Sequence, residues 1–417
     1  MKTYGCIGKK LTHSFSREIH ARLADYTYNL IELSEEEVGA FLQKKDFAAI
    51  NVTIPYKETV IPYLDSIDAE AVKIGAVNTI VNRNGRLYGY NTDCYGMKAL
   101  IAKIGIDLSG KKVLILGTGG TSKTARVVAS ELGTAEILVV SRHAAENGVT
   151  ITYEEALREH TDAEVIINTT PVGMYPNPAS VPIDIDGFAH LSGVVDAVYN
   201  PLATNLIRNA RERGIPAEGG LYMLVMQAVA AVEHFLDKKI PQSIGDEVFA
   251  EIMAEKANIV LIGMPGSGKS TVGKLLAANG FAFVDTDTEV ERQCGCSIKD
   301  FIHDKGERAF RELESTVVRS VSMESGRIIA TGGGVPLREE NLRALRQNGR
   351  IFFLDAPLSR LCATDDRPLA DTREKLAKLY AERQDIYKNA ADVIVPAMDT
   401  PDDEAAYIQM KRKERIF

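Results

Sequence analysis

The residues best suited to chemistry stand past the middle of the chain, in GMPGSGKS at residues 263–270. The apolar run NIVLI precedes them and a helical pattern follows, so the glycines occupy a turn between a strand and a helix. Glycines in such a turn let backbone N–H groups surround phosphate oxygens. Lys269 adds a positive charge for the outer phosphates, and the Ser270 hydroxyl is suited to Mg²⁺. The motif therefore predicts a nucleoside triphosphate site formed by Gly263, Gly266, Ser267, Gly268, Lys269, Ser270 and Thr271.

Polar runs follow this motif along the chain. The next strand ends in VDTD, which places Asp285 and Asp287 at the carboxyl edge of a sheet, where α/β proteins bind ligands. Because side chains alternate along a strand, both carboxylates should point to the same side. GERAFRELE, TGGG, DDRPLA and YAERQDIY come after them. In this order the runs resemble shikimate kinase, a small member of the nucleoside monophosphate kinase-like group, over nearly all of residues 258–417.

The resemblance to shikimate kinase implies roles for the polar residues. Asp285 would lie near Mg²⁺ with Ser270, and Asp287 would bind the acceptor hydroxyls and could take a proton, although loose phosphoryl transfer needs little help from a base. Planar guanidinium groups suit the shikimate carboxylate, and a lid cation would neutralise charge on the moving phosphate. The residues in these roles are Arg311 and Arg383 for the carboxylate, Gly332, Gly333 and Gly334 beside the ring, and Arg367 on the lid. Between Leu361 and Arg367 the lid holds only CATDD, which is shorter and more acidic than the family pattern.

A second glycine turn lies in KKVLILGTGGTSKTARVVASELG, residues 111–133, again between a strand and a helix but without a phosphate-binding lysine. Gly117, Gly119 and Gly120 suit a dinucleotide whose pyrophosphate lies over the N-terminus of the following helix. Ser122 stands at the third fingerprint position, so the match is imperfect, and a plain strand–helix turn is the alternative.

The end of the next strand, AEILVVSRH, bears on the choice of nucleotide. An acid there would hold the ribose 2′-hydroxyl of NAD, but this chain has Ser141 and Arg142 instead. An arginine beside a small hydroxyl suits the 2′-phosphate of NADP, with an ordinary surface charge as the alternative. No second basic residue follows Arg142 within a few positions, which leaves the strength of the NADP preference open.

Polar motifs surround this dinucleotide turn on both sides. THSFS, INVTIPYK, GAVNTIV and GYNTD precede it, and NTTPVGM, DAVYNP and GGLYMLVMQA follow it. Together they closely resemble shikimate dehydrogenase, across residues 1–245. One departure is Arg17, which follows Ser16 where the family usually has proline.

The resemblance to shikimate dehydrogenase implies a catalytic pair, Lys57 and Asp93. Reduction of a ketone places negative charge on its oxygen, which a nearby ammonium stabilises and protonates, while a carboxylate holds the lysine. Without the surrounding motifs, a surface ion pair would be the simpler interpretation. The implied substrate residues are Ser14 and Ser16 at the carboxylate, Thr53, Asn78 and Gln227 at the ring hydroxyls, and Tyr199 near the nicotinamide.

Alternating strands and helices must position all these residues, and the alternation predicts parallel α/β layers with buried strands. We expect a two-lobed dehydrogenase, with an α/β substrate domain and a Rossmann-like NADP domain, followed by a P-loop α/β kinase domain with a parallel sheet. The expected bounds are 1–103 for the substrate domain, completed by about 222–250, then 104–221 for the NADP domain and 257–417 for the kinase domain.

Composition excludes several classes of protein. The 417 residues carry a net charge of −8, which argues against nucleic-acid binding. Apolar runs have strand length, and the start, MKTYGCIGKK, lacks a signal-peptide pattern, so we expect no membrane association. Five scattered cysteines indicate a reducing compartment, hence the cytoplasm, with Cys294 and Cys296 as plain thiols. The sequence does not indicate an oligomeric state.

The two resemblances together imply a bifunctional enzyme of the shikimate pathway. NADPH would reduce 3-dehydroshikimate to shikimate, and ATP with Mg²⁺ would then phosphorylate the new hydroxyl to give shikimate 3-phosphate. A non-catalytic metabolite sensor built from the same domains is one alternative, although all the catalytic residues are present. An NAD-dependent quinate/shikimate dehydrogenase is another, which Ser141 and the attached kinase domain both disfavour.

Overall fold

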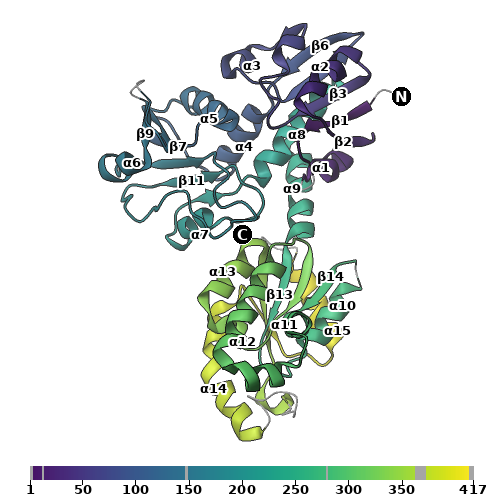
Figure 1. Cartoon of the computed structure of the whole chain (residues 1–417), viewed down its shortest axis with the longest axis vertical. Helices are drawn as coiled ribbons and strands as arrows, with labels where there is room; N and C mark the ends of the chain where they lie inside the picture. Colours follow the sequence, from purple (N-terminus) through teal and green to yellow (C-terminus); the bar gives the residue numbers. More distant parts are fainter. Residues whose placement is uncertain (1–2, 12–13, 146–148, 279, 362–371, 413–417) are drawn as a thin grey trace. The chain divides into compact units, whose positions relative to one another are not determined.

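The computed structural model describes residues 3–11, 14–145, 149–278, 280–361 and 372–412. The chain forms two compact units, Met1–Ile252 and Met253–Phe417 (Figure 1). Two six-stranded sheets belong to the first unit and one five-stranded sheet to the second. None of the helices among the described residues is both long and apolar enough to cross a membrane.

The first sheet has the strand order β2-β1-β3-β5-β6-β4. Its strands are β1 (Thr3–Gly8), β2 (Tyr28–Glu32), β3 (Phe47–Val52), β4 (Ser66–Ile67), β5 (Thr79–Arg83) and β6 (Arg86–Tyr90). β1 is parallel to β2 and β3, whereas β5 is antiparallel to β3 and β6. This sheet therefore departs from the predicted parallel layers. The pairing of β5 with β6 follows from the turn at Asn84 and Gly85, whose φ values of 54° and 83° are those of a tight hairpin between neighbouring strands.

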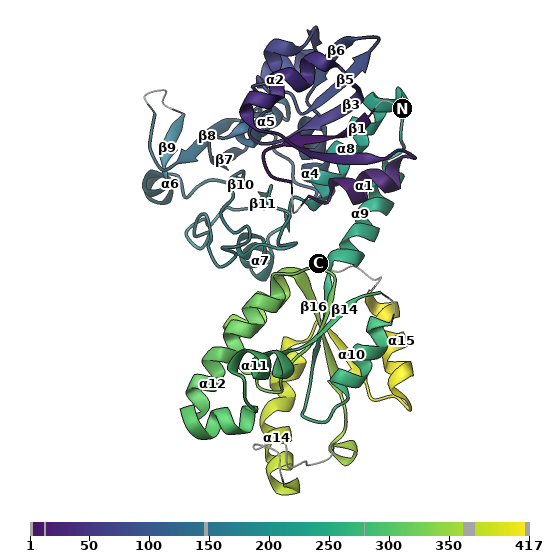
Figure 2. The same ribbon diagram turned by 45° about the vertical axis from the view of Figure 1, so that its right-hand side comes forward.

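Helices from two distant stretches of sequence pack around this sheet. They are α1 (Ser16–Leu23), α2 (Glu35–Lys44), the short η1 (Ile61–Tyr63), α3 (Ala69–Ile74), α4 (Asp93–Lys103) and α8 (Leu221–Leu236). α8 is apolar on nearly every side, as a helix buried between layers must be, and it lies beside α1 (Figure 2). α4 packs against both α8 and α5 (Gly120–Glu131), so Met97, Val113 and Met226 share one buried core. This core is formed by α4, α5 and α8 together with strands of the second sheet, and α8 also contacts β3 and β5 of the first sheet.

The second sheet has the order β12-β11-β10-β7-β8-β9, and its paired strands are all parallel. The strands are β7 (Lys112–Leu116), β8 (Glu136–Ser141), β9 (Thr150–Thr152), β10 (Val165–Asn168), β11 (Gly193–Asp196) and β12 (Ala217–Glu218), with helices α5, α6 (Tyr153–Glu159) and α7 (Asn205–Glu212). The strand order reverses at β7, which lies between β8 and β10. In open α/β sheets, ligands bind at the carboxyl ends of the strands at such a reversal.

The sheet of the C-terminal unit is parallel throughout, in the order β14-β15-β13-β16-β17. Its strands are β13 (Asn258–Ile262), β14 (Ala282–Asp285), β15 (Arg327–Ala330), β16 (Gly349–Asp355) and β17 (Val393–Pro396). α9 (Gln242–Lys256) begins in the first unit and leads into β13. The helices of the C-terminal unit are α10 (Lys269–Ala277), α11 (Thr286–Cys294), α12 (Ile298–Ser322), α13 (Glu339–Asn348), α14 (Arg373–Ala390) and α15 (Pro401–Arg412), with short η2 (Val335–Leu337) and η3 (Leu358–Arg360). Val260 and Ile262 enter one core and Ile259 and Leu261 another, so successive residues of β13 are buried on opposite faces of the sheet.

Candidate active sites in the two units

The N-terminal unit brings Lys57 and Asp93 into direct contact. Lys57 lies in the turn after β3, and Asp93 is the first residue of α4. Lys57 Nζ donates a hydrogen bond to Asp93 Oδ2 at 2.5 Å, and the two side chains are only 17% and 11% exposed. Fully exposed ion pairs contribute little to stability, whereas a largely buried pair fixes the direction of the lysine ammonium. The arrangement is suited to stabilising negative charge on a reacting oxygen and to donating a proton to it.

Asn78 connects this pair to Thr92 and Gln227. Asn78 Nδ2 donates to Asp93 Oδ1 at 2.8 Å, and Asn78 Oδ1 accepts from the backbone N–H of Thr92 at 2.7 Å. The Thr92 hydroxyl lies 3.4 Å from Gln227 Oε1, which comes from α8. Two predicted substrate residues, Asn78 and Gln227, thus share one polar network with Asp93. Thr92 was not among the predicted site residues, although its place in GYNTD beside Asp93 was a usable signal.

The predicted carboxylate-binding serines lie outside that network. Ser14 and Ser16 flank Phe15 at the start of α1, and the Ser16 N–H donates to Ser14 Oγ at 3.3 Å. Phe15 meets Tyr199 edge-on, with ring centroids 5.4 Å apart. Tyr199 therefore lies close to the serine turn. Thr53 follows β3, four positions before Lys57, and its backbone N–H donates to the Ile7 carbonyl at 3.0 Å.

The glycine turn after β7 leaves space for a ligand. Gly117 has φ of 102°, a value that favours glycine. A Cβ added at Gly119 or Gly120 would meet nothing within 4 Å, so the protein's own packing does not require glycine at either position. Both lie at the N-terminus of α5, where free N–H groups and the helix dipole favour a phosphate group. Ser122 is buried in the first turn of α5. The turn fits the pyrophosphate of a dinucleotide.

The end of β8 fits the same ligand. Ser141 is the last residue of β8, its Oγ accepts from the His143 N–H at 3.4 Å, and Arg142 is exposed. An exposed guanidinium at this position is available to a phosphate on the ribose.

The phosphate-binding loop of the C-terminal unit has the backbone geometry that glycine allows. Gly263, Gly266 and Gly268 have φ values of 149°, 82° and 89°. Lys269 Nζ donates to the carbonyls of Gly263 and Met264 at 3.0 and 2.9 Å. A cradle of backbone N–H groups at the start of α10, with a lysine folded over it, fits the phosphates of ATP.

The remaining loop residues divide between the interior and the surface. Ser267 Oγ is buried and has no hydrogen-bond partner among the described residues, and Thr271 is exposed. The Ser270 hydroxyl donates to Asp285 Oδ2 at 2.6 Å. A hydroxyl and a carboxylate side by side are the oxygen ligands that Mg²⁺ takes beside a nucleotide.

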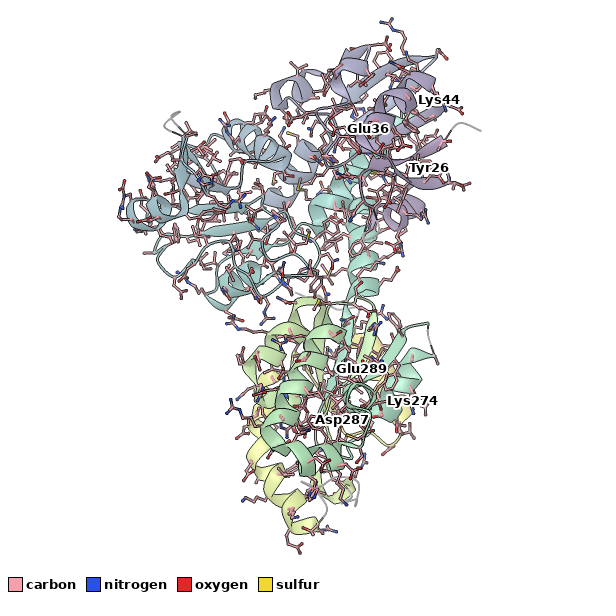
Figure 3. All side chains as sticks on the ribbon, viewed as in Figure 1. Tyr26, Glu36, Lys44, Lys274, Asp287 and Glu289 are labelled. Carbon is pink, nitrogen blue, oxygen red and sulfur yellow. The ribbon has the colours of Figure 1, made fainter. Side chains whose placement is uncertain are left out.

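Asp285 and Asp287 do not share a strand, contrary to the alternation argument. β14 ends at Asp285, which caps α11 by accepting a hydrogen bond from the Asp287 N–H at 3.0 Å. Aspartate is a favoured N-cap, so the helix begins immediately after it and carries Asp287 in its first turn (Asp287 is labelled in Figure 3). Burial within the surrounding protein raises the pKa of Asp287 to about 6, and the Asp285 charge adds to this effect. A carboxyl group of this kind is suited to exchanging a proton near neutral pH.

A pocket of about 450 Å³ opens beside these two carboxylates. Its polar wall includes Ser270, Asp285, Asp287, Arg311, Glu314, Gly332, Gly333, Gly334 and Arg383, and its apolar wall includes Ile298, Ile302, Phe310 and Leu379. The predicted acceptor residues Asp287, Arg311, Arg383 and the three glycines are therefore brought to one cavity. Two arginines facing it suit a planar carboxylate. Arg367 lies outside the described residues.

The three consecutive glycines pass tightly against their neighbours. A Cβ at Gly334 would overlap the Arg311 guanidinium, and one at Gly332 would overlap Asp287 Oδ1. At Gly333 the nearest atoms would be those of Pro265 at 3.2 Å. The backbone thus passes directly beside the charged groups of the pocket.

Sequence reasoning missed Glu314, which holds Arg311, and Tyr387, which shares a backbone acceptor with Arg383. Both carboxylate oxygens of Glu314 accept from Arg311 Nη1, and the Tyr387 hydroxyl donates to the Gly333 carbonyl at 2.6 Å. Arg383 Nη1 donates to the same carbonyl at 3.0 Å. The spacings Arg311–Glu314 and Arg383–Tyr387 place each pair on one face of a helix, which was the available signal.

Known proteins match both units of the chain. Residues 265–412 match the family model for shikimate kinase, and residues 6–80 match the family model for the shikimate dehydrogenase substrate binding domain. The shikimate dehydrogenase (NADP(+)) of Clostridium perfringens (strain 13 / Type A) is 37% identical over 268 residues, which are 60% of this chain and 98% of that protein.

Solved structures give the same assignment for the N-terminal unit. The crystal structure of shikimate dehydrogenase 1 from Peptoclostridium difficile has a TM-score of 0.56 at 38% identity and covers 60% of this chain and 98% of its own. The shikimate 5-dehydrogenase from Thermus thermophilus, in complex with NADP(H) and shikimate, has a TM-score of 0.54 at 29% identity, covering 60% and 99%. The chain therefore belongs to the shikimate dehydrogenase family, and its C-terminal unit carries a shikimate kinase domain.

Proposed function

We propose that this chain is a bifunctional enzyme of the shikimate pathway. The N-terminal unit reduces 3-dehydroshikimate to shikimate with NADPH, and the C-terminal unit phosphorylates the new hydroxyl with ATP and Mg²⁺ to give shikimate 3-phosphate. The observation that carries the proposal is the presence in one chain of the Lys57–Asp93 contact and of a phosphate loop beside an arginine-lined pocket. The product of the first reaction is the substrate of the second.

In the reductase site, Lys57 is the proton donor and Asp93 the residue that orients it. Bound NADPH supplies the hydride. The Lys57 ammonium stabilises the oxygen that becomes negative as the ketone is reduced, and it passes a proton to that oxygen. Asn78, Gln227 and Thr53 bind the ring hydroxyls. Ser14 and Ser16 bind the carboxylate, and Tyr199 closes the site near the nicotinamide.

The nucleotide of the reductase is bound by the turn after β7 and the end of β8. Gly117, Gly119 and Gly120 admit the pyrophosphate, and Ser141 and Arg142 hold the 2′-phosphate. The support for NADPH over NADH is Arg142, an exposed guanidinium in the position where an acid would hold the hydroxyl of NAD.

In the kinase site, Asp287 accepts a hydrogen bond from the shikimate hydroxyl that becomes phosphorylated. Arg311 and Arg383 bind the carboxylate of shikimate. Mg²⁺ bound to ATP neutralises phosphate charge. Lys269 and the loop residues 263–271 hold the phosphates, and Ser270 with Asp285 provides the oxygen ligands of the metal. We further propose that Arg367 neutralises charge on the transferring phosphate. The chain's contribution is mainly to bring acceptor and phosphate into line and to stabilise negative charge.

The domain organisation that we propose is 1–103 with about 222–250 for the substrate domain, 104–221 for the NADP domain and 257–417 for the kinase domain. Each of the three sheets takes all its strands from one of these stretches, which supports the division. We further propose a cytoplasmic enzyme with small-molecule substrates and no nucleic-acid or membrane partner. Cys6, Cys94, Cys294 and Cys296 are free thiols, as a reducing compartment favours.

The test is a pair of assays on one purified chain. NADPH consumption with 3-dehydroshikimate and ATP consumption with shikimate should both occur. Lys57→Ala should abolish the first and spare the second, and Lys269→Ala should do the reverse. Binding of shikimate without either turnover would instead favour the metabolite sensor, and loss of both activities in both variants would contradict two independent sites.

A further inference from the structure

A continuous line of buried hydrogen bonds ends at the Asp93 carboxylate. The Tyr28 hydroxyl lies 2.7 Å from Asn51 Oδ1, and Asn51 Nδ2 lies 3.1 Å from Thr79 Oγ1. Thr79 Oγ1 lies 3.1 Å from Asn78 Oδ1, and Asn78 Nδ2 lies 2.8 Å from Asp93 Oδ1. The line crosses β2, β3 and β5, with Asn51 and Thr79 directly opposite each other in the sheet. All five residues are buried, and the most exposed of them, Asp93, is 8% exposed as a whole residue.

A hydrogen bond to the backbone determines which groups donate in the first two hydrogen bonds of this line. Asn51 Nδ2 lies 3.3 Å from the Asn78 carbonyl, an acceptor only, so the other end of the amide, Oδ1, must face Tyr28. The Tyr28 hydroxyl is consequently the donor to Asn51. Burial holds the pKa of Tyr28 well above its usual range, which keeps this hydroxyl protonated.

The last two hydrogen bonds, from Thr79 to Asn78 and from Asn78 to Asp93, also donate toward Asp93. The backbone N–H of Thr92 donates to Asn78 Oδ1 at 2.7 Å, which fixes that amide with Nδ2 toward Asp93. Because Thr79 Oγ1 accepts from Asn51, its own proton goes to Asn78 Oδ1 directly or to Thr92 Oγ1 at 3.2 Å, and the Thr92 hydroxyl lies 3.2 Å from the same Asn78 Oδ1. Hydrogen bonds that all point one way polarise one another and favour negative charge at the final acceptor.

We propose that Tyr28, Asn51 and Thr79 are positioning residues of the reductase, which act through Asn78 to orient and polarise the Asp93 carboxylate and thereby aim Lys57. The inference rests on the reductase function proposed above and deepens it. Asp93 accepts from Lys57 with one oxygen and from Asn78 with the other, so rotation of the carboxylate would move the ammonium. None of the three residues needs to touch the substrate.

The experiment compares Thr79→Val with Thr79→Ser in the full chain. Valine keeps the shape but removes the central hydroxyl, and serine restores that hydroxyl. We expect Thr79→Val to lower kcat for 3-dehydroshikimate about 3- to 10-fold, as loss of a buried hydrogen bond implies, with KM within about twofold of wild type. Thr79→Ser should retain most of the wild-type kcat. Equal kcat in both variants, or a KM effect without a kcat effect, would overturn the proposal.

A second pair tests the far end of the line. Tyr28→Phe removes its first donor and should also lower kcat. Tyr26→Phe removes a tyrosine hydroxyl that contacts His20 Nδ1 at 2.7 Å outside the line, and it should leave kcat unchanged (Tyr26 is labelled in Figure 3). Equal losses in both variants would indicate a general effect of cavity formation and would count against the proposal.

Acylation of Lys57 by acetic anhydride, followed by mass spectrometry, separates this inference from the proposed activity. If the wild-type chain did not reduce 3-dehydroshikimate, the proposed function would fail, but Thr79→Val should still make Lys57 react faster than in Thr79→Ser, because a loosened carboxylate shields the amine less. Equal reaction of Lys57 in the two variants would overturn the positioning role whatever the activity. Lys103, on the far end of α4, is the internal reference.

Discussion

Glu314 holds Arg311 in the wall of the kinase pocket, where the two carboxylate oxygens of Glu314 accept from Arg311 Nη1 at 3.0 and 2.9 Å. The Glu314 side chain is 1% exposed and that of Arg311 14%. Burial raises the pKa of Glu314, and the Arg311 charge opposes that rise. Arg311 lines the pocket and is held by this pair, so it is ready to receive a carboxylate without first becoming ordered.

Glu314→Gln should weaken shikimate binding. The amide offers one acceptor oxygen in place of two and no charge, so Arg311 is left partly unpaired in a buried place. We expect the KM for shikimate to rise about tenfold while the KM for ATP changes little. Glu307→Gln is the matched control, because Glu307 also pairs with Arg311, at 3.2 Å, but is 56% exposed. Equal effects of the two substitutions on KM would contradict the assignment.

Alanine substitutions in the glycine triplet 332–334 should lower kinase activity to different extents. Gly334→Ala places a methyl group on the Arg311 guanidinium, which Glu314 prevents from moving away, whereas Gly333→Ala brings a methyl group to 3.2 Å from Pro265. We therefore expect Gly334→Ala to lower kcat/KM for shikimate at least about 100-fold and Gly333→Ala to lower it much less. Steady-state ATP turnover measures both, with NADPH oxidation by the same preparation as the internal control. A larger loss in Gly333→Ala would show that the clash does not decide the outcome.

Asp287 should make the stability of the C-terminal unit depend on pH. Its folded pKa is raised from 3.8 to about 6, so the fold favours the neutral form, and the stability that this gives is present at low pH and lost as the pH rises through about 6. Asp287→Asn should remove this pH-dependent loss of stability, because an asparagine side chain does not ionise. The melting temperature of the variant minus that of wild type should therefore be larger at pH 8 than at pH 4.

Differential scanning calorimetry on the full chain measures this difference. The transition of the C-terminal unit is the one that added ADP shifts upward. A difference that stays constant between pH 4 and pH 8 would mean that the Asp287 carboxyl titrates like an ordinary surface group.

The local motifs could be predicted from sequence because their physics is local. The turn at 263–270 and the helix that follows it need only glycine conformations, one lysine and an amphipathic pattern. The ends of elements were harder to predict. VDTD continues a strand by alternation, but Asp285 is also a good helix cap, and capping ended the strand two residues earlier.

Contacts between distant strands could not be predicted in the same way. Tyr28, Asn51 and Thr79 lie on three strands, and only the register of β3 against β5 makes Asn51 and Thr79 neighbours. Register depends on the whole sheet, including the hairpin turn at Asn84 that made β5 and β6 antiparallel. The resemblance named Asn78 and Asp93, while the residues behind them became visible only when the sheet was assembled.

Arg142 should decide the nucleotide preference of the reductase. Arg142→Ala removes an exposed guanidinium and little else, so the KM for NADPH should rise about tenfold while the KM for NADH is unaffected. Arg126→Ala, on α5, is the matched control for loss of an exposed cation in the same domain. An equal rise for both nucleotides would indicate that Arg142 does not contact the 2′-phosphate.

The last prediction concerns the metal of the kinase. Ser270 Oγ donates to Asp285 Oδ2 at 2.6 Å, so the hydroxyl and carboxylate oxygens that we propose as ligands of Mg²⁺ already lie side by side. Asp285→Asn keeps an oxygen and the shape but removes the charge that attracts the ion. The Mg²⁺ concentration for half-maximal kinase activity should rise about tenfold or more, and the reductase should be unaffected.

Mn²⁺ provides the matching control for Asp285→Asn. Because Mn²⁺ accepts the same octahedral oxygen set and loses its water more readily than Mg²⁺, it should restore part of the activity. An Asp285→Asn chain with an unchanged Mg²⁺ requirement would remove Asp285 from the metal site. The capping contact to the Asp287 N–H would then be its remaining role, since an asparagine side chain caps a helix as well as aspartate does.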